Sequence, residues 1–213
     1  MKVEQYGLTY YRIDKNDLEL IRYWRNQNFI RNTMQFKEYI TPEMQNNWFE
    51  SINNPYNYYF LITSENIKLG LISCKNTAMD TRIAEGGIFI WDEKFWGTPI
   101  PVLASMSMLE TIFFILESGE ASTATIRKEN KRALKFNELL GYKIIGESEN
   151  KECWRLILYK SDYILIKRKL EKSVRIFSQG QNKIFISGKP DKNQDEVLND
   201  YFVKQQLTAG GQL

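Results

Sequence analysis

The sequence of 213 residues contains no histidine and only two cysteines. Histidine is the usual general base near neutral pH and a ligand of most zinc sites. Its absence therefore excludes Ser-His-Asp and Cys-His nucleophile systems and the common zinc centres. Cys74 and Cys153 lie far apart and form no C-x-x-C pair, which argues against a disulfide framework and favours a reducing, cytoplasmic setting. We expect no metal, and chemistry based on carboxylates, amides and backbone groups.

Long hydrophobic runs are also missing. The longest uncharged run, residues 95–109, has 15 residues and includes Pro99 and Pro101. A bilayer-spanning helix needs roughly 20 apolar residues, so we expect no membrane span. Residues 1–5, Met-Lys-Val-Glu-Gln, lack the basic and then apolar pattern of a signal peptide.

The residues that are present are those of a globular protein, with 43% hydrophobic and 14% aromatic residues. The length fits one large domain, or one domain with a small appendage. Residues 1–160 carry 20 cationic and 20 anionic side chains, and residues 161–213 carry 9 and 6, so the tail holds the whole net charge of +3. A basic tail is either a solvated surface or a nucleic-acid footprint. The excess is small, so we expect the former and no nucleic-acid partner.

Hydrophobic periodicity and capping residues predict an α/β chain up to about residue 160. Asp14 with Asp17, and Thr41 followed by Pro42, are typical helix starts. Helices are expected after these caps, over 102–116 and from Asn130, and strands at 7–13, 58–63, 67–75, 83–91, 121–126, 142–145 and 153–159. Beyond residue 160 the pattern predicts a strand at 163–166, a β-hairpin of 174–178 with 183–187, and a helix over 191–207.

Three local motifs accompany this order of elements. They are Glu-Gly-Gly-Ile-Phe-Ile-Trp at 85–91, Phe-Trp-Gly-Thr-Pro-Ile-Pro at 95–101, and Asn-Lys-Arg-Ala at 130–133 followed by Phe-Asn-Glu-Leu-Leu-Gly-Tyr at 136–142. Together they resemble the GCN5-related N-acetyltransferase (GNAT) family over roughly residues 7–160. The resemblance implies a mixed, mostly antiparallel sheet flanked by helices in a domain of residues 1–160. Residues 161–213 would then be a C-terminal strand, β-hairpin and helix extension that serves dimerisation or covers the acceptor site.

The resemblance implies acyl-CoA as the co-substrate. A loop that enters a helix N-terminus collects free N–H groups and suits a pyrophosphate. Here Pro99 and Pro101 replace the family's Gly-x-Gly pair and donate no N–H. The predicted N–H donors that remain are Gly97, Thr98, Ile100, Val102 and Leu103. The loop is therefore either a modified CoA site or only the start of a core helix. The predicted acyl-CoA contacts are Ile88, Phe89, Ile90, Gly97, Thr98, Ile100, Val102, Leu103, Asn130 and Arg132.

Two residues are predicted to act in catalysis. Glu85 is the best placed general base, because it starts the strand beside which the family holds the thioester. The alternative is that Glu85 is only a solvated acid at the strand end. A water chain or a backbone carbonyl would then act as the base. Asn137 stands where many members have a tyrosine that protonates the thiolate, and an amide can only donate a hydrogen bond to sulfur. Backbone N–H groups of residues 88–90 would stabilise the oxyanion.

The acceptor is predicted from a pattern that begins at the end of the first helix, namely Tyr-Trp-Arg-Asn at 23–26, Ile-Arg at 30–31, Met34 and Gln-x-x-Trp at 45–48. This pattern resembles the branch that acylates nucleotide-linked amino sugars, such as the enzymes of pseudaminic acid synthesis, and arginine binds phosphate oxygens well. The predicted contacts are Trp24, Arg25, Asn26, Arg31 and Met34. We expect transfer of an acetyl or short hydroxyacyl group, such as hydroxybutyryl, and a homodimer. The alternatives are a RimJ/RimL-like protein N-terminal acetyltransferase, an aminoglycoside acetyltransferase and a non-catalytic CoA-binding module.

Overall fold

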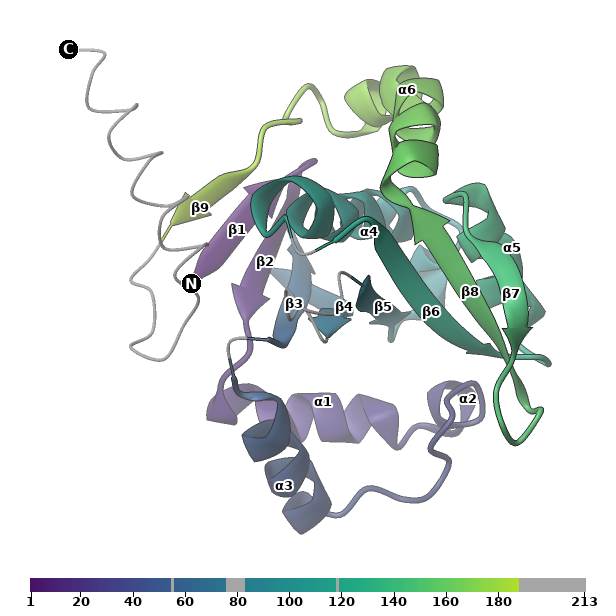
Figure 1. The fold of residues 1–213 in the computed structure, drawn as a ribbon. Helices are drawn as coiled ribbons and strands as arrows, with labels where there is room; N and C mark the ends of the chain where they lie inside the picture. Colours follow the sequence, from purple (N-terminus) through teal and green to yellow (C-terminus); the bar gives the residue numbers. More distant parts are fainter. Residues whose placement is uncertain (55, 76–82, 118, 188–213) are drawn as a thin grey trace.

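The computed structural model describes residues 1–54, 56–75, 83–117 and 119–187. Nine strands form one sheet in the order β7-β8-β6-β5-β4-β3-β2-β1-β9 (Figure 1). The strands are β1 (Lys2–Gln5), β2 (Leu8–Arg12), β3 (Tyr58–Ser64), β4 (Ile67–Lys75), β5 (Ile83–Ile90), β6 (Ala121–Arg127), β7 (Lys143–Glu147), β8 (Cys153–Tyr159) and β9 (Phe185–Ser187). All neighbours are antiparallel except β5 and β6. The predicted mixed and mostly antiparallel sheet is therefore confirmed.

Helices cover both faces of this sheet. They are α1 (Leu18–Arg25), α2 (Asn28–Arg31), α3 (Pro42–Ile52), α4 (Ile100–Glu110), α5 (Lys131–Leu139) and α6 (Lys160–Phe177). Helices α1, α2 and α3 lie together below the sheet in Figure 1, and α4 lies on the opposite side. A π-helical turn, Thr111–Ile115, continues α4.

Alternation along the central strands builds a hydrophobic core on each face. In β3, Tyr58 belongs to the core under α4, whereas Tyr59 belongs to the core under α1 and α3. Leu71 and Ile72 of β4 divide in the same way. Because successive side chains of a strand point to opposite faces, a strand with helices on both sides is apolar throughout.

The predicted helix starts are confirmed. The Thr41 hydroxyl accepts the N–H of Met44 at 3.2 Å, and Pro42 occupies the first turn of α3. Asp14 and Asp17 form a capping box at the start of a 3-10 turn, Lys15–Asp17, and this turn leads into α1. These caps depend only on neighbouring residues, which is why the sequence reveals them.

The two parallel strands separate after a short contact. β5 and β6 pair only from Ile83 with Ala121 to Glu85 with Thr123. Beyond this point, residues 86–90 of β5 remain paired to β4, and residues 124–127 of β6 remain paired to β8. The facing edges of β5 and β6 therefore carry backbone N–H and C=O groups that no strand satisfies, and they border a wedge-shaped gap.

The predicted strand at 163–166 and the predicted first hairpin strand at 174–178 are wrong. Residues 160–177 form α6, which buries Tyr163 and Val174 and packs Leu170 against the same core. The β-branched and aromatic residues of this segment favour a strand locally. Their helical spacing, however, gives α6 a single apolar face that packs against the core. β9 does form, within the predicted second strand, but it pairs with β1 and not with residues 174–178.

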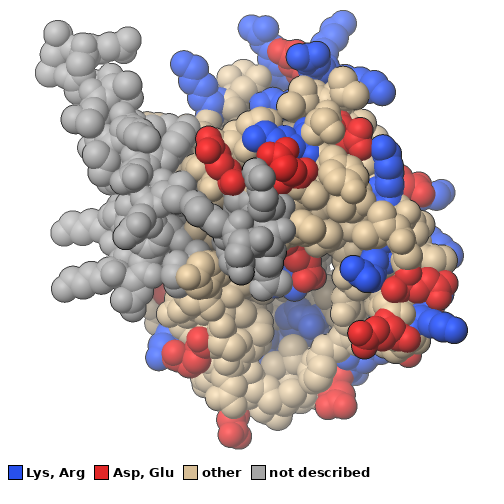
Figure 2. Space-filling model, in the orientation of Figure 1, with Lys and Arg blue, Asp and Glu red and all other residues tan. Residues whose placement is uncertain are grey.

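The basic surface of the tail lies on α6. Figure 2 shows Lys and Arg side chains gathered at the top of the view, where α6 lies in Figure 1. The cations of this helix are Lys160, Lys167, Arg168, Lys169, Lys172 and Arg175. The helix predicted over 191–207 lies outside the described residues. Within the described ranges, none of the helices is both long and apolar enough to cross a membrane.

Candidate active site

A cavity of about 850 Å³ lies in the gap between β5 and β6 and continues beneath α1 and α3. Residues 85–90 and 124–127 of the two strands line its middle, and residues of α5 line one end. Its other end is bordered by helices α1 and α3 and by the segment of residues 33–36. The cavity brings together nine of the predicted site residues, namely Arg25, Met34, Glu85, Ile88, Phe89, Ile90, Asn130, Arg132 and Asn137.

The α5 end of the cavity is cationic. Asn130 caps α5, its side chain accepting the N–H of Ala133 at 3.1 Å, as the sequence predicts for an N-cap. Arg132 lies over the ring of Trp96 at 3.2 Å from the centroid. Arg127 lines the same end and is held by Glu129 and Glu152. A helix N-terminus beside two guanidinium groups favours an anionic ligand.

Replacing Asn130 by alanine tests this end of the cavity. We expect N130A to lower the free energy of unfolding by about 1 kcal/mol, because α5 loses its cap. We also expect weaker binding of acyl-CoA, since Asn130 lines the cavity. Chemical denaturation and calorimetry with acetyl-CoA measure the two effects. T41A removes the equivalent cap of α3, so it is the control, and equal affinities of the two variants for acetyl-CoA would contradict a binding role.

The loop before α4 lies beside this end of the cavity. Of the five predicted N–H donors, Thr98 donates to the Phe95 carbonyl, Ile100 to the Thr98 hydroxyl and Leu103 to the Pro99 carbonyl. Leu103 is also buried in the core. These bonds start α4 and occupy three of the donors. The two remaining predicted donors are Gly97 and Val102, and only Trp96 and Pro101 of this segment line the cavity.

Glu85 lies at the point where β5 and β6 separate. Its carboxylate pairs with Lys75 Nζ at 2.9 Å, across the β4 and β5 ladder. Tyr59 lines the same part of the cavity, where burial, together with the negative charge of Glu85, raises its pKa to about 12. Tyr59 is thus a neutral hydrogen-bond donor near neutral pH, and Glu85 is the one carboxylate among the described residues that line the cavity.

Asn137 and Tyr142 lie near the same strands. Asn137 Nδ2 donates to the Ala133 carbonyl at 2.9 Å, so one of its two N–H groups is already used within α5. The Tyr142 hydroxyl shares a hydrogen bond of 2.7 Å with Ser122, and burial raises its pKa. A Cβ at Gly86 would lie only 2.7 Å from Met108 Cε and 3.4 Å from that hydroxyl. Glycine therefore lets β5 pack closely against Met108 of α4 and against Tyr142.

The predicted acceptor residues divide into two groups. Arg25 and Met34 line the cavity. Trp24 instead stacks on Trp91, with centroids 5.8 Å apart and rings 3° from parallel, inside the core beneath α1. Arg31 donates to Asn28 on the outer surface of α2. We therefore correct the prediction for Trp24, because its ring is already packed and does not face the cavity.

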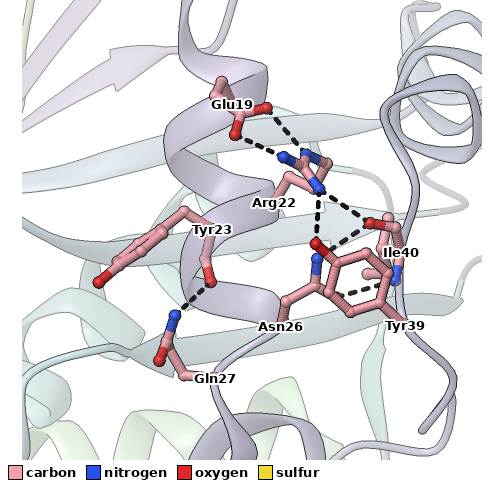
Figure 3. Close-up of polar contacts among 7 residues, drawn as sticks. All are labelled: Glu19, Arg22, Tyr23, Asn26, Gln27, Tyr39 and Ile40. Atoms are coloured by element: carbon pink, nitrogen blue, oxygen red, sulfur yellow. Dashed lines mark hydrogen bonds and ion pairs between the residues drawn. The ribbon is translucent and has the colours of Figure 1, made fainter.

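Asn26 has a structural role that the sequence did not reveal. Its Nδ2 donates to the Ile40 carbonyl at 2.9 Å, and its Oδ1 accepts the Ile40 N–H at 2.8 Å. Arg22 donates to the same carbonyl and to the Tyr39 hydroxyl (Figure 3). These bonds fasten the segment before α3 to the end of α1. Asn26 thus borders the cavity only indirectly, through Ile40, which lines it.

Loss of this fastening should affect both stability and acceptor binding. We expect N26A to lower the free energy of unfolding by about 1–3 kcal/mol, because the part-buried Ile40 N–H loses its partner, whereas the Ile40 carbonyl keeps its bond from Arg22. The KM for the acceptor amine should rise more than the KM for acyl-CoA. Urea denaturation and steady-state kinetics measure both effects. N28A removes an exposed amide of α2 and serves as the control; an equal response of the two variants would contradict the role assigned to Asn26.

Several residues that line the cavity were not among the predicted site residues. They are Lys75, Phe36, Trp48, Tyr59, Arg127, Tyr142 and above all Gln45. Gln45 and Trp48 belong to the Gln-x-x-Trp pattern that resembles the amino-sugar branch, but the sequence assigned them no role in the site. In α3, Met44 is exposed while Gln45 and Phe49 are buried, so the helix turns Gln45 inward.

The cavity fits an acyl-CoA thioester. Backbone groups of β5 and β6 that no other strand pairs match the amides of an extended pantetheine arm, and the arginines near α5 match its phosphates. The acyl-CoA supplies an activated carbonyl. The strand edges of the chain would hold it, with the carboxylate of Glu85 beside the point where those edges meet.

Comparisons with known proteins agree with this arrangement. The sequence model described as Acetyltransferase (GNAT) domain matches residues 8–143. A search of curated proteins gives no match. Among solved structures, a domain from Methanocaldococcus jannaschii DSM 2661 is 24% identical with a TM-score of 0.60, and covers 71% of this chain and 97% of that one. The complex of Vibrio cholerae spermidine N-acetyltransferase with CoA and spermine is 18% identical, with a TM-score of 0.62 and coverage of 74% and 98%.

These structural likenesses show the fold, and the family match adds the chemistry. It covers the strands, α4 and α5 around the cavity. Acetyl-CoA is the co-substrate of this family, and the described residues contain no cluster of side chains suited to a metal ion. The chain therefore belongs to the acetyltransferase (GNAT) domain family and is an acyl-CoA-dependent N-acyltransferase.

Proposed function

We propose that the enzyme transfers an acetyl or short hydroxyacyl group to the amine of a nucleotide-linked amino-deoxy sugar. The observation that carries this proposal is the charge of the cavity. Its described lining contains the cations Arg25, Lys75, Arg127 and Arg132, and one carboxylate, Glu85. Glu85 is already paired with Lys75. An excess of positive charge favours an anionic acceptor as well as the anionic CoA.

The same charge balance argues against a polyamine acceptor. The Vibrio cholerae neighbour is a spermidine N-acetyltransferase, yet a polycation binds best where several carboxylates converge. This cavity offers one paired carboxylate in the described part of the chain. An aminoglycoside is disfavoured for the same reason. A nucleotide sugar instead brings phosphates, and flat rings that can pack on Trp48 and Phe36, which line the acceptor side.

The roles of the chain's residues follow from their places. The strands β5 and β6 hold the thioester, so that the acceptor nitrogen attacks its carbonyl as the C–N bond forms and the C–S bond breaks. Glu85 takes the proton that the amine loses, and CoA leaves as a thiolate that takes up a proton from solvent. Neither a nucleophilic side chain nor a metal is required for direct transfer to an amine. A chain without histidine can therefore perform this reaction.

A panel of amines tests the proposal. The enzyme is incubated with acetyl-CoA and, separately, with a UDP-amino sugar, a dTDP-amino sugar, spermidine, an aminoglycoside and a peptide with a free N-terminus. We expect mass spectrometry to detect an acetyl group on a nucleotide sugar and the highest kcat/KM for that class. Preferential acetylation of spermidine or the peptide would overturn the proposal. Binding of acetyl-CoA without transfer to any amine would instead indicate a non-catalytic module.

The assembly of the enzyme stays a prediction. We propose a homodimer, in which residues 161–213 contribute to the contact or to a cover of the acceptor site. The described part of this segment, α6 and β9, packs on the domain's own core and sheet edge. Analytical ultracentrifugation of the full chain measures the oligomeric state directly.

A further inference from the structure

The cavity contains two buried hydrogen-bond donors that have no partner. Arg25 Nη1 and Gln45 Nε2 are both shielded from solvent, and neither makes a hydrogen bond. Gln45 is only 4% exposed, and both residues line the cavity beneath α1 and α3. A buried donor without a partner lowers the stability of the folded state by about 1–3 kcal/mol. Such donors are therefore rare in native proteins, and each needs an explanation such as a bound ligand.

The described residues also supply no counter-ion to the guanidinium of Arg25. Among the other cations of the cavity, Lys75 pairs with Glu85 and Arg127 pairs with Glu129 and Glu152. Arg25 contacts the face of the Phe89 ring, 5.9 Å from its centroid, and has no ion pair among the described residues. Its burial lowers the pKa of the guanidinium, a cost that an anionic ligand would relieve.

The surroundings of these two donors define the group that would fit. Ile21, Tyr59 and Leu71 line the same part of the cavity and are buried in the core under α1 and α3. A largely apolar wall with two unpaired donors, one of them cationic, matches a compact group with one negative charge and acceptor oxygens. Neither Arg25 nor Gln45 carries a carboxylate that could pair with the ammonium group of a cationic ligand.

We propose that Arg25 and Gln45 form an oxyanion subsite that binds a carboxylate or phosphate group of the acceptor, beneath α1 and α3. This inference rests on the proposed transfer to an anionic acceptor, and it specifies where and by which groups the anion is held. The amine of such an acceptor then extends toward Glu85 and the gap between β5 and β6. Arg25 and Gln45 determine specificity, and they take no part in bond making.

The test compares R25M and Q45L with the wild type on three acceptors, an amino sugar carrying a carboxylate, one carrying a phosphate, and a neutral amino sugar. We expect the ratio of kcat/KM for the better anionic acceptor to that for the neutral one to fall about 10- to 100-fold in each variant, as for loss of a hydrogen bond to a charged group. If the ratio falls only for the acceptor with a carboxylate, the subsite binds a carboxylate, and if it falls only for the acceptor with a phosphate, the subsite binds a phosphate. R155M, which removes an exposed arginine of β8, is the control.

Stability separates this role from a structural one. Leucine has a similar size and no donor to satisfy, so Q45L should leave the melting temperature of the free enzyme unchanged or raise it. Sodium acetate and inorganic phosphate should raise the melting temperature of the wild type more than that of R25M or Q45L. A lower melting temperature of Q45L, or an unchanged anionic preference in both variants, would overturn the inference.

The experiments distinguish failure of the subsite from failure of the proposed function. If nucleotide sugars are acetylated and the two variants keep the wild-type preference, the subsite is wrong and the proposed function stands. If no nucleotide sugar is acetylated, but another amine with a carboxylate is, and its use depends on Arg25 and Gln45, the subsite stands and the proposed function fails.

Discussion

Replacing Glu85 by glutamine should lower kcat/KM for acyl transfer by about 100-fold or more, the usual contribution of a positioned general base. Glutamine keeps the size of the side chain and cannot accept the proton of the amine. Affinity for acetyl-CoA should change little, since β5 keeps its backbone at the edge of the gap. Single-turnover kinetics with saturating acetyl-CoA measure the rate of transfer, and calorimetry measures the affinity.

Two further variants distinguish catalysis from the loss of an ion pair. E50Q breaks the exposed pair of Lys15 and Glu50, which has the same 2.9 Å separation as the pair of Lys75 and Glu85. It should keep the wild-type rate. K75M removes the partner of Glu85 but leaves its carboxylate, so it should lose much less activity than E85Q. Equal losses in K75M and E85Q would assign the pair a structural role and contradict general-base catalysis.

The second large effect concerns Tyr163, whose side chain is 0% exposed. Y163A should lower the free energy of unfolding by about 3–5 kcal/mol, as expected when a buried aromatic ring is deleted. The ring packs against Phe113 at 5.6 Å between centroids, and its hydroxyl donates to the Met106 carbonyl at 3.2 Å. The residue thus fastens α6 to α4. Urea denaturation monitored by tryptophan fluorescence measures the loss.

A matched control lies on the same helix. Leu165 is 54% exposed, so L165A should change the free energy of unfolding by less than about 0.5 kcal/mol. Y163F should lose only about 1 kcal/mol, since it removes the hydroxyl and keeps the ring. A loss in Y163A no larger than that in L165A would show that α6 is not part of the folding unit.

The elements that could be predicted depend on short-range physics. The caps at Asp14, Thr41 and Asn130 are satisfied by residues two or three positions away. The hairpin between β3 and β4 turns at Glu65 and Asn66, both of which have positive φ, as two-residue turns often require. Alternation and helical periodicity locate the central strands and helices for the same reason.

The C-terminal segment shows where this reasoning fails. Residues 174–178, Val-Arg-Ile-Phe-Ser, read locally as a strand, and yet they finish α6 because Val174 and Tyr163 reach the same core as α4. Likewise, residues 185–187 form a strand whose partner, β1, lies at the other end of the chain. Propensity is a weak influence when tertiary burial opposes it.

The candidate site divides in the same manner. The motifs at 85–91 and 130–137 indicate the strand and the helix that line the cavity, because their residues are contiguous. Gln45 belongs to the Gln-x-x-Trp pattern at 45–48, but only the packing of α3 on the sheet turns its side chain inward. Asn26 and Trp24 are the sequence neighbours of Arg25, but neither lines the cavity as Arg25 does. Asn26 binds the loop at Ile40, and Trp24 stacks on Trp91.

The sequence by itself determined the family and the motifs of the strand and the helix that line the cavity, because these depend on contiguous residues. Only the tertiary structure decided how β5 and β6 separate, where the tail packs and which polar groups are left unpaired beneath α1 and α3. Those features depend on burial, and burial is set by contacts between residues that are distant in the chain.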